Sequence, residues 1–423
     1  MKSGWRIGSL FGIPLFLDPS WFFILALVTI IYGSEWQSYH VADGVEWIVG
    51  FCMALLLFSS VLMHELGHSL VALSQGIRVH SITLFLFGGI ASIEKESKTP
   101  LQALQVAIAG PAVSFLLFLG LTLFKHIVPL EKGAGMILGR LASINLILTI
   151  FNMMPGLPLD GGQVLKALIW QATGNRLKGM RWAARSGQIF GWVAICIGTI
   201  LYLNSFEPVL LWLAVIGWFG IRNAKGYSRM ANIQHVMLSL TATDVMSRRF
   251  RVADATLSVQ DFIQQYLIDV EEKPERKRHD LYFAASNGRY KGAIDVKDLQ
   301  QIERSQWNTL TLNEIAVPLT NIPSVTEASS LVEVISYLEQ DQLTEVTVLS
   351  PAGAVAGVLD RSDIVTRIMH DLDFTLSSEM LDHMYENQEY PSALPLSQLA
   401  RTLNDDSSIE NSGNAVSDDA SLR

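Results

Sequence analysis

Two histidines and a glutamate stand together in one of the most apolar parts of the chain. His64 and His68 are four residues apart, so a helix would present both imidazoles on one face, and Glu65 lies beside them. Two imidazoles at this spacing can hold one divalent metal ion, and the carboxylate can take a proton from water that the ion activates. Ionisable residues in an apolar helix are costly, so this pattern predicts a hydrolytic metal centre.

Hydrolysis at a zinc ion usually needs a third protein ligand. Glu94 and Glu96 follow downstream, but in an expected surface loop. Asp160 is the better candidate, because prolines and glycines on both sides of it (Pro155, Pro158, Gly161 and Gly162) break the helix and let a carboxylate turn inward. The alternative is that Asp160 only caps the next helix, expected to begin near Gln163.

Two asparagines precede Asp160. The amide of Asn152 could hold a peptide carbonyl or a developing oxyanion, and interhelical hydrogen bonding is an equally good interpretation. Asn145 is expected to serve packing. The small residues of 107–114 predict a close approach between helices.

The elements that must position these residues are predicted to be membrane helices. Of 423 residues, 50% are hydrophobic and 17% charged, against about 25% charged in average soluble proteins. Apolar runs near the length that crosses a bilayer occur at 19–33, 47–73, 101–124, 135–154, 188–204 and 208–222. The β-branched and aromatic segment 76–93, broken by Gly88-Gly89, predicts a hairpin or bulged strand at the membrane surface.

Charge sets the orientation. Lys and Arg gather before the first span, between spans two and three, between spans four and five, and after span six, so both termini are predicted to be cytosolic. Residues 1–230 hold 16 Lys and Arg against 10 Asp and Glu, and the rest hold 15 against 30. Neither half has the concentrated basic face that nucleic acid requires, so no nucleic-acid partner is expected.

The sequence resembles the site-2 protease family of intramembrane zinc metalloproteases. The matching residues lie at roughly 60–165 and are His64-Glu65-Leu66-Gly67-His68, Phe87-Gly88-Gly89, Ala109-Gly110-Pro111 and Asn152-x-x-Pro155…Leu159-Asp160-Gly161. The resemblance implies one Zn²⁺ per chain on His64, His68 and Asp160, with Glu65 as the catalytic base. It also implies cleavage of single-pass membrane proteins, such as membrane-anchored anti-sigma factors, in or near their spans, in the cell membrane of a prokaryote. An edge strand within 81–93 could receive the unwound substrate by strand addition.

The fold class predicted is a six-span helical membrane domain (1–230) with a small membrane-associated β element, followed by a soluble α/β part and a disordered tail. An internal repeat runs through 240–372: Gly292-Ala-Ile-Asp295-Val-Lys-Asp298 matches Gly357-Val-Leu-Asp360-Arg-Ser-Asp363. The repeats (about 240–302 and 308–372) resemble a tandem cystathionine-β-synthase (CBS) pair, each a strand-helix-strand-strand-helix unit. The acidic segment 373–423 is expected to be largely disordered beyond about 400.

The CBS resemblance leaves the ligand open. Members of that family commonly use a Ser or Thr three residues before the Asp to bind an adenine-nucleotide ribose, and here Asp295 and Asp360 stand at that place, ahead of Asp298 and Asp363. A carboxylate near phosphates is unfavourable unless ribose hydroxyls satisfy it. A nucleotide-sensing pair and a purely structural pair, which could form a homodimer, therefore both remain open.

One alternative function stands beside the protease. A CBS-gated membrane transporter for a metal or small solute could use His64, His68 and Asp160 as a translocation site. Glu65 discriminates between them, since a transporter would tolerate Glu65→Gln and a hydrolase would lose turnover while keeping its metal.

Overall fold

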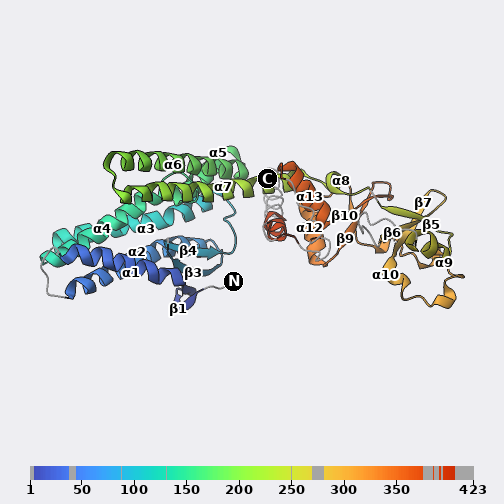
Figure 1. Cartoon of the computed structure of the whole chain (residues 1–423), viewed down its shortest axis with the longest axis horizontal. Coiled ribbons are helices and arrows are strands. Elements are labelled where there is room, and N and C mark those ends of the chain that lie inside the picture. Colours follow the sequence, from blue (N-terminus) through green and yellow to red (C-terminus); the bar gives the residue numbers. More distant parts are fainter. Residues whose placement is uncertain are drawn as a thin grey trace, which may run out of the picture. The chain divides into compact units, whose positions relative to one another are not determined.

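The computed structural model describes residues 4–37, 44–86, 88–129, 131–248, 250–268, 281–374, 384, 390–391 and 394–404. The chain divides into two compact units, Met1–Ala231 and Asn232–Arg423, which are described separately. Figure 1 shows the first unit as long helices with a small sheet beside α1 and α2, and the second as short strands and helices.

The first unit is built on apolar helices. They are α1 (Pro19–Gln37), α2 (Val45–Ser74), α3 (Pro100–Ile127), α4 (Lys132–Asn152), α5 (Asp160–Thr173), α6 (Arg176–Ser205) and α7 (Leu211–Ser239). Five of the described helices, α1, α2, α3, α4 and α6, are long and apolar enough to cross a membrane. The predicted span 208–222 falls on a 3-10 turn, Pro208–Leu210, and the start of α7, whose apolar stretch ends at Arg222. Six spans therefore stays a prediction.

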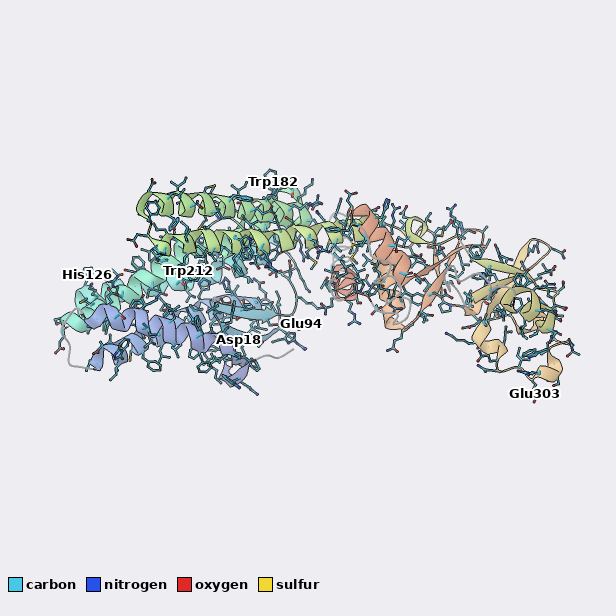
Figure 2. All side chains as sticks on the ribbon, in the orientation of Figure 1. Asp18, Glu94, His126, Trp182, Trp212 and Glu303 are labelled. Atoms are coloured by element: carbon cyan, nitrogen blue, oxygen red, sulfur yellow. The ribbon has the colours of Figure 1, made fainter. Side chains whose placement is uncertain are left out.

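Side chains on these helices face outward as expected in lipid. Trp182 on α6 and Trp212 on α7, both labelled in Figure 2, are more than half exposed. The start of the first helix is capped: Asp18, also labelled in Figure 2, accepts hydrogen bonds from the backbone N–H and the hydroxyl of Ser20, and Pro19 opens α1.

A four-stranded sheet lies beside α2. Its strands are β1 (Trp5–Leu10), β2 (Ile13–Leu17), β3 (Val79–Phe85) and β4 (Gly88–Ile93), in the order β1-β2-β3-β4. The predicted hairpin in 76–93 is confirmed as the antiparallel pair of β3 and β4. Strands β1 and β2 were not predicted. Strand β2 pairs with β3 in parallel across more than 60 residues of chain, a register that local sequence does not encode. Phe87 lies outside the described residues.

The sheet buries one face against α2. Ile13 and Leu15 of β2 and Ile82 of β3 pack in one cluster with Leu66 and Ala72 of α2. The alternation of buried and half-buried residues along β2 is what a strand with one covered face should show. Helix α2 contacts α1 and α3 as well, α3 contacts α4 and α5, and α5 contacts α6. The segment that carries the two histidines is thus enclosed by helices and sheet.

The second unit contains two copies of one order of elements. In the first copy α8 (Ala242–Val245), β5 (Arg251–Asp254), α9 (Val259–Phe262) with the π-helix Ile263–Ile268, β6 (Leu281–Ser286), β7 (Arg289–Asp295) and α10 (Val296–Leu299) follow one another. In the second copy the order is α11 (Leu312–Ile315), β8 (Ser324–Thr326), α12 (Leu331–Gln340), β9 (Glu345–Leu349), β10 (Val355–Asp360) and α13 (Arg361–Asp371). Short 3-10 helices are described at Arg304–Gln306 and Leu319–Asn321, and at Pro208–Leu210 in the first unit. Each copy forms one three-stranded sheet with a parallel and an antiparallel pairing.

The two copies exchange backbone bridges symmetrically. Ser247, ahead of the first sheet, pairs with Val358 of β10, and Val317, ahead of the second sheet, pairs with Ala293 of β7. Each copy also opens with the same capping box, Thr241 with Asp244 and Thr311 with Glu314. The copies are therefore related by an approximate two-fold axis and share one fold.

Candidate metal centre

The structure brings His64, His68 and Asp160 together. The Nε2 atom of His64 lies 3.0 Å from Oδ2 of Asp160 and 3.3 Å from Nε2 of His68, and the latter lies 3.3 Å from the same Oδ2. Both histidines are buried and Asp160 is partly exposed. Among the described residues this is the cluster whose ligand atoms could hold one metal ion.

The hydrogen bonds of the Nδ1 atoms, which point away from Asp160, bear on whether the Nε2 atoms carry a proton or a free lone pair. Nδ1 of His68 lies 2.7 Å from the carbonyl oxygen of Val106, which can only accept, so this nitrogen carries the proton. Nε2 of a neutral His68 is then a bare lone pair facing a carboxylate and a second imidazole. Nδ1 of His64 similarly meets the hydroxyl of Ser114 at 2.9 Å. Lone pairs and a carboxylate that converge in this way would be satisfied by a cation between them.

The donor set fits zinc. Two imidazoles and one carboxylate are ligands that Zn²⁺ takes, with one position left for water in hydrolytic sites. In a tetrahedral site with bonds of about 2.0–2.1 Å the ligand atoms stand about 3.3 Å apart. The three separations found here, 3.0, 3.3 and 3.3 Å, match that spacing.

Helix α3 supports both histidines from behind. Its residues Ala107, Gly110, Pro111 and Ser114 form a buried stripe, as the small residues of 107–114 predicted. A side chain at Gly110 would put its Cβ 2.2 Å from Nε2 of His68, so only glycine leaves room for the ring there. The stripe therefore acts as scaffold for the metal site.

Asp160 is delivered by a loop that rests on α6. Asp160 is the first residue of α5, and Leu159 occupies the N-cap position. Within the loop Leu157 is buried, and its N–H donates to the carbonyl of Ala183 on α6 at 3.0 Å. Asp160 does begin the next helix, about one turn earlier than the expected Gln163. It is not only a helix-starting residue, however, because its carboxylate points to the two imidazoles.

Glu65 lies on the side of α2 that faces β4. A Cβ at Gly89 would approach Cγ of Glu65 to 2.5 Å, and the backbone N–H of Ala91 is directed at the carboxylate. Among the described strands β4 is at the edge of the sheet, and Glu65 lies against it, next to the two histidines of its own helix. This is a position from which a carboxylate could act on a bound peptide.

The two asparagines, Asn145 and Asn152, differ in burial and in hydrogen bonding. Asn145 is fully buried and its amide donates to the hydroxyl of Ser60 and to a carbonyl of its own helix, so it serves packing as expected. Asn152 is the last residue of α4 and is half-buried. Its side-chain amide has no hydrogen-bond partner in the part of the chain that is described, and its role stays a prediction.

An ion-pair cluster near the site was not predicted. Glu96, in the loop after β4, pairs with Lys166 of α5 at 2.6 Å and with Arg176 of α6 at 2.8 Å. Desolvation opposes ionisation of Glu96, but these two cations hold its pKa down at about 2. Glu94 is exposed. In the sequence Lys166 and Arg176 are two of several basic residues between the fourth and fifth predicted spans. Their positions give no sign that they pair with Glu96, which lies 70 or more residues earlier.

In the second unit Asp295, Asp360 and Asp363 take part in helix caps. Asp295 accepts from the N–H of Lys297, and Asp360 from that of Asp363, whose own carboxylate reaches back to Asp360 N–H. Asp298 lies in the first turn of α10.

Of the expected tail, residues 396–404 are helical, with Leu396, Leu399 and Leu403 buried, and 405–423 lie outside the described residues.

Comparison with known proteins agrees with this geometry. The model of peptidase family M50 matches residues 52–129 and 122–194. A Synechocystis protein named as a zinc metalloprotease, sll0528, is 45% identical over 86% of this chain and 95% of its own length. The zinc metalloprotease Rip3 of Mycobacterium tuberculosis is 30% identical over 82% of this chain and 87% of its own. The solved site-2 protease of Methanocaldococcus jannaschii is 28% identical over 53% of this chain and 95% of that one, with a TM-score of 0.39.

Proposed function

This chain belongs to peptidase family M50, the site-2 proteases, and from that premise we propose that it hydrolyses peptide bonds in or near the transmembrane segments of single-pass membrane proteins. The observation that carries the proposal is the convergence of His64, His68 and Asp160 within 3.3 Å of one another in apolar helices, with Glu65 adjacent. Membrane-anchored regulators such as anti-sigma factors are the substrate class we expect.

The residues divide the chemistry between them. His64, His68 and Asp160 would hold Zn²⁺, which polarises a carbonyl and makes water more acidic. Glu65 accepts the proton that the attacking water loses and then gives it to the departing amine, so that the amine leaves uncharged. We propose that the side-chain amide of Asn152 donates a hydrogen bond to the oxygen of the scissile carbonyl as negative charge develops there.

We assign the substrate to the edge of β4. A helical substrate hides its carbonyls in intrahelical hydrogen bonds, so it must unwind before attack. An unwound segment that adds to β4 recovers backbone hydrogen bonds there, next to Glu65. The backbone of β4 would thus bind substrate with little dependence on its side chains.

The topology follows the charges. We propose six spans with both termini in the cytosol, in the cell membrane of a prokaryote, so that the metal centre lies near the cytosolic side. The second unit then lies in the cytosol. We propose that it regulates cleavage, through an adenine nucleotide bound near Asp295, Asp298, Asp360 and Asp363 or through a homodimer formed by the CBS pair.

Glu65→Gln tests the catalytic proposal. The variant should keep one zinc ion per chain and lose at least about 100-fold in cleavage rate, the usual effect of a general base. The purified protein is incubated with tagged single-pass membrane proteins, and zinc is measured by elemental analysis. Glu94→Gln, outside the site, is the matched control and should cleave normally. Undiminished turnover in Glu65→Gln would favour the transporter instead.

Ile90→Pro tests the strand edge. Ile90 is 57% exposed on β4, and proline removes a backbone donor and obstructs pairing on that strand. We expect cleavage to be lost and the zinc content to stay unchanged, whereas Ile90→Val should behave as the unaltered protein. Full cleavage by the proline variant would contradict strand addition and leave the metal chemistry standing.

A further inference from the structure

The strand β1 presents an apolar surface that no described part of the chain covers. All six of its residues are exposed, Trp5 by 62% and Ile7 by 54%. Phe11, in the turn to β2, is 72% exposed and has a positive φ of 51°, which a phenylalanine rarely adopts. A soluble surface would not keep three large apolar side chains at one sheet edge.

The packing of the sheet sets the depth of this surface. The neighbouring strands β2 and β3 pack against α2 between Phe58 and Ala72. About 20 helical residues suffice to cross a hydrocarbon core, and in α2 these would be 45–64. The sheet therefore borders the last turns of the span and the layer just beyond it.

The surface of β1 also continues onto α1. The ring of Trp5 meets Phe22 edge-on at 5.4 Å between centroids, and Phe22 and its neighbour Phe23 are exposed by 44% and 66%. These two residues lie in the first turns of a helix that is apolar enough to cross a membrane. Apolar side chains thus run without interruption from the hairpin to the lipid-facing side of α1.

Polar groups limit how deep the hairpin can go. As an edge strand, β1 has one row of unpaired backbone groups, which would be strongly unfavourable in hydrocarbon. Arg6, exposed on the same strand, has no carboxylate partner among the described residues. Tryptophan and arginine beside one another are typical of the headgroup layer, where rings reach the acyl chains and guanidinium groups reach phosphates.

We propose that the β1–β2 hairpin is a membrane-interface anchor, with Trp5, Ile7 and Phe11 seated at the boundary between headgroups and acyl chains, on the side of the membrane where α1 begins. The occupant of this surface is the lipid bilayer, and Arg6 pairs with lipid phosphates. The anchor holds β2, and through it the sheet, at a fixed height against α2. This inference rests on the membrane topology proposed above.

Lipid quenching at single labels tests it. In full-length protein with Cys52→Ala and Cys196→Ala, a fluorescent label is placed at Phe11→Cys, or at Ile7→Cys as a second reporter on the strand. Ile30→Cys, exposed on α1 within its candidate span, is the membrane control, and Ser305→Cys, exposed in the second unit, is the aqueous control. Vesicles of phosphatidylcholine and phosphatidylglycerol carry nitroxide quenchers near the headgroup or deep in the chain.

The expected result is ordered by depth. The shallow quencher should remove about half of the Phe11→Cys and Ile7→Cys signal and the deep one much less, whereas Ile30→Cys should show the reverse and Ser305→Cys no quenching. Signals at positions 11 and 7 as insensitive as that at 305 would overturn the proposal and point to a protein partner on this surface. Deep quenching at both would overturn the interfacial placement. Loss of quenching at Ile30→Cys would instead refute the topology.

Discussion

At the scale of single residues, the metal centre depends on two partners that do not touch the metal. Ser114 and the carbonyl of Val106 hold the outer nitrogens of His64 and His68, so both imidazoles are fixed in orientation, and the carbonyl also fixes the tautomer of His68. Such outer partners commonly contribute a factor of about 10–100 to metal affinity. Both come from α3, a helix that supplies none of the three ligands.

We expect Ser114→Ala to lower zinc affinity about 10- to 100-fold. The hydroxyl is fully buried against His64, and its loss frees the ring to rotate. Affinity is measured by competition with a chelator, and thermal unfolding of the metal-free protein checks the fold. Ser143→Ala on α4, whose hydroxyl only meets a carbonyl of its own helix, is the control. An unchanged zinc affinity in Ser114→Ala would deny this serine a positioning role.

At this scale the sequence predicted the site correctly where the spacing of residues along the chain determines which side chains meet. His64, Glu65 and His68 could be placed on one helix because four residues make about one turn. Asp160 could be joined to them because glycine and proline mark the break that turns it inward. Ser114 could not be assigned, because a serine fifty residues away has no periodic relation to His64 and its contact exists only after α2 and α3 have packed.

At the scale of elements, helix α6 supports residues 155–157, the loop that leads to Asp160. A Cβ at Gly187 would come within 2.1 Å of the carbonyl oxygen of Leu157, so the loop lies directly on the helix backbone. The hydroxyl of Ser186 also donates to the carbonyl of Pro155. The position of Asp160 therefore depends on the contact between α6 and residues 155–157.

Gly187→Ala should push the loop away from α6 and weaken zinc binding at least about tenfold, since overpacking of this kind costs roughly 1–3 kcal/mol. Gly220→Ala on α7 is the matched control, because nothing lies within 4 Å of a Cβ there. Both variants are assayed for zinc affinity by chelator competition. Equal affinities in the two would show that the loop does not need this seat.

The sheet shows where prediction at this scale stops. The hairpin of β3 and β4 could be predicted, because its residues alternate and Gly88 allows the turn, with a φ of 133° that suits glycine. Strands β1 and β2 could not, because their partner lies far along the chain and six exposed residues in β1 read as an ordinary polar and apolar mixture. The same holds for Glu96, whose partners Lys166 and Arg176 lie on two later helices.

At the scale of the whole molecule, the second unit carries its own stabilising centre. Arg361, at the start of α13, makes two hydrogen bonds to Glu339 at 2.8 and 3.1 Å and one to the carbonyl of Leu343 at 2.6 Å. Its guanidinium also lies 5.7 Å from the ring of Tyr390, and burial raises the pKa of that phenol. One arginine thus joins α12, α13 and the segment that follows them.

We expect Arg361→Ala to lower the free energy of unfolding of the second unit by about 3 kcal/mol, because Glu339 is left without its partner. The zinc site of the first unit should not change. Hydrogen exchange of the α12 and β9 amides reports the first effect and chelator competition the second. Arg367→Ala removes a partly exposed i,i+4 pair with Asp371 and should cost less than about 1 kcal/mol. A loss of zinc in Arg361→Ala would contradict the independence of the two units.

The repeat in this unit was visible in the sequence because its two copies keep the same residue pattern 65 positions apart. What could not be seen is that the copies exchange bridges, since the pairings of Ser247 with Val358 and of Val317 with Ala293 join segments from different copies. A local pattern describes one copy at a time.

That exchange has a consequence for a copy taken by itself. Each copy extends its sheet edge with backbone from the other, so a solitary copy would leave an open edge and an unanchored leading segment. Such a fragment should therefore associate with a second copy of itself through the same edges.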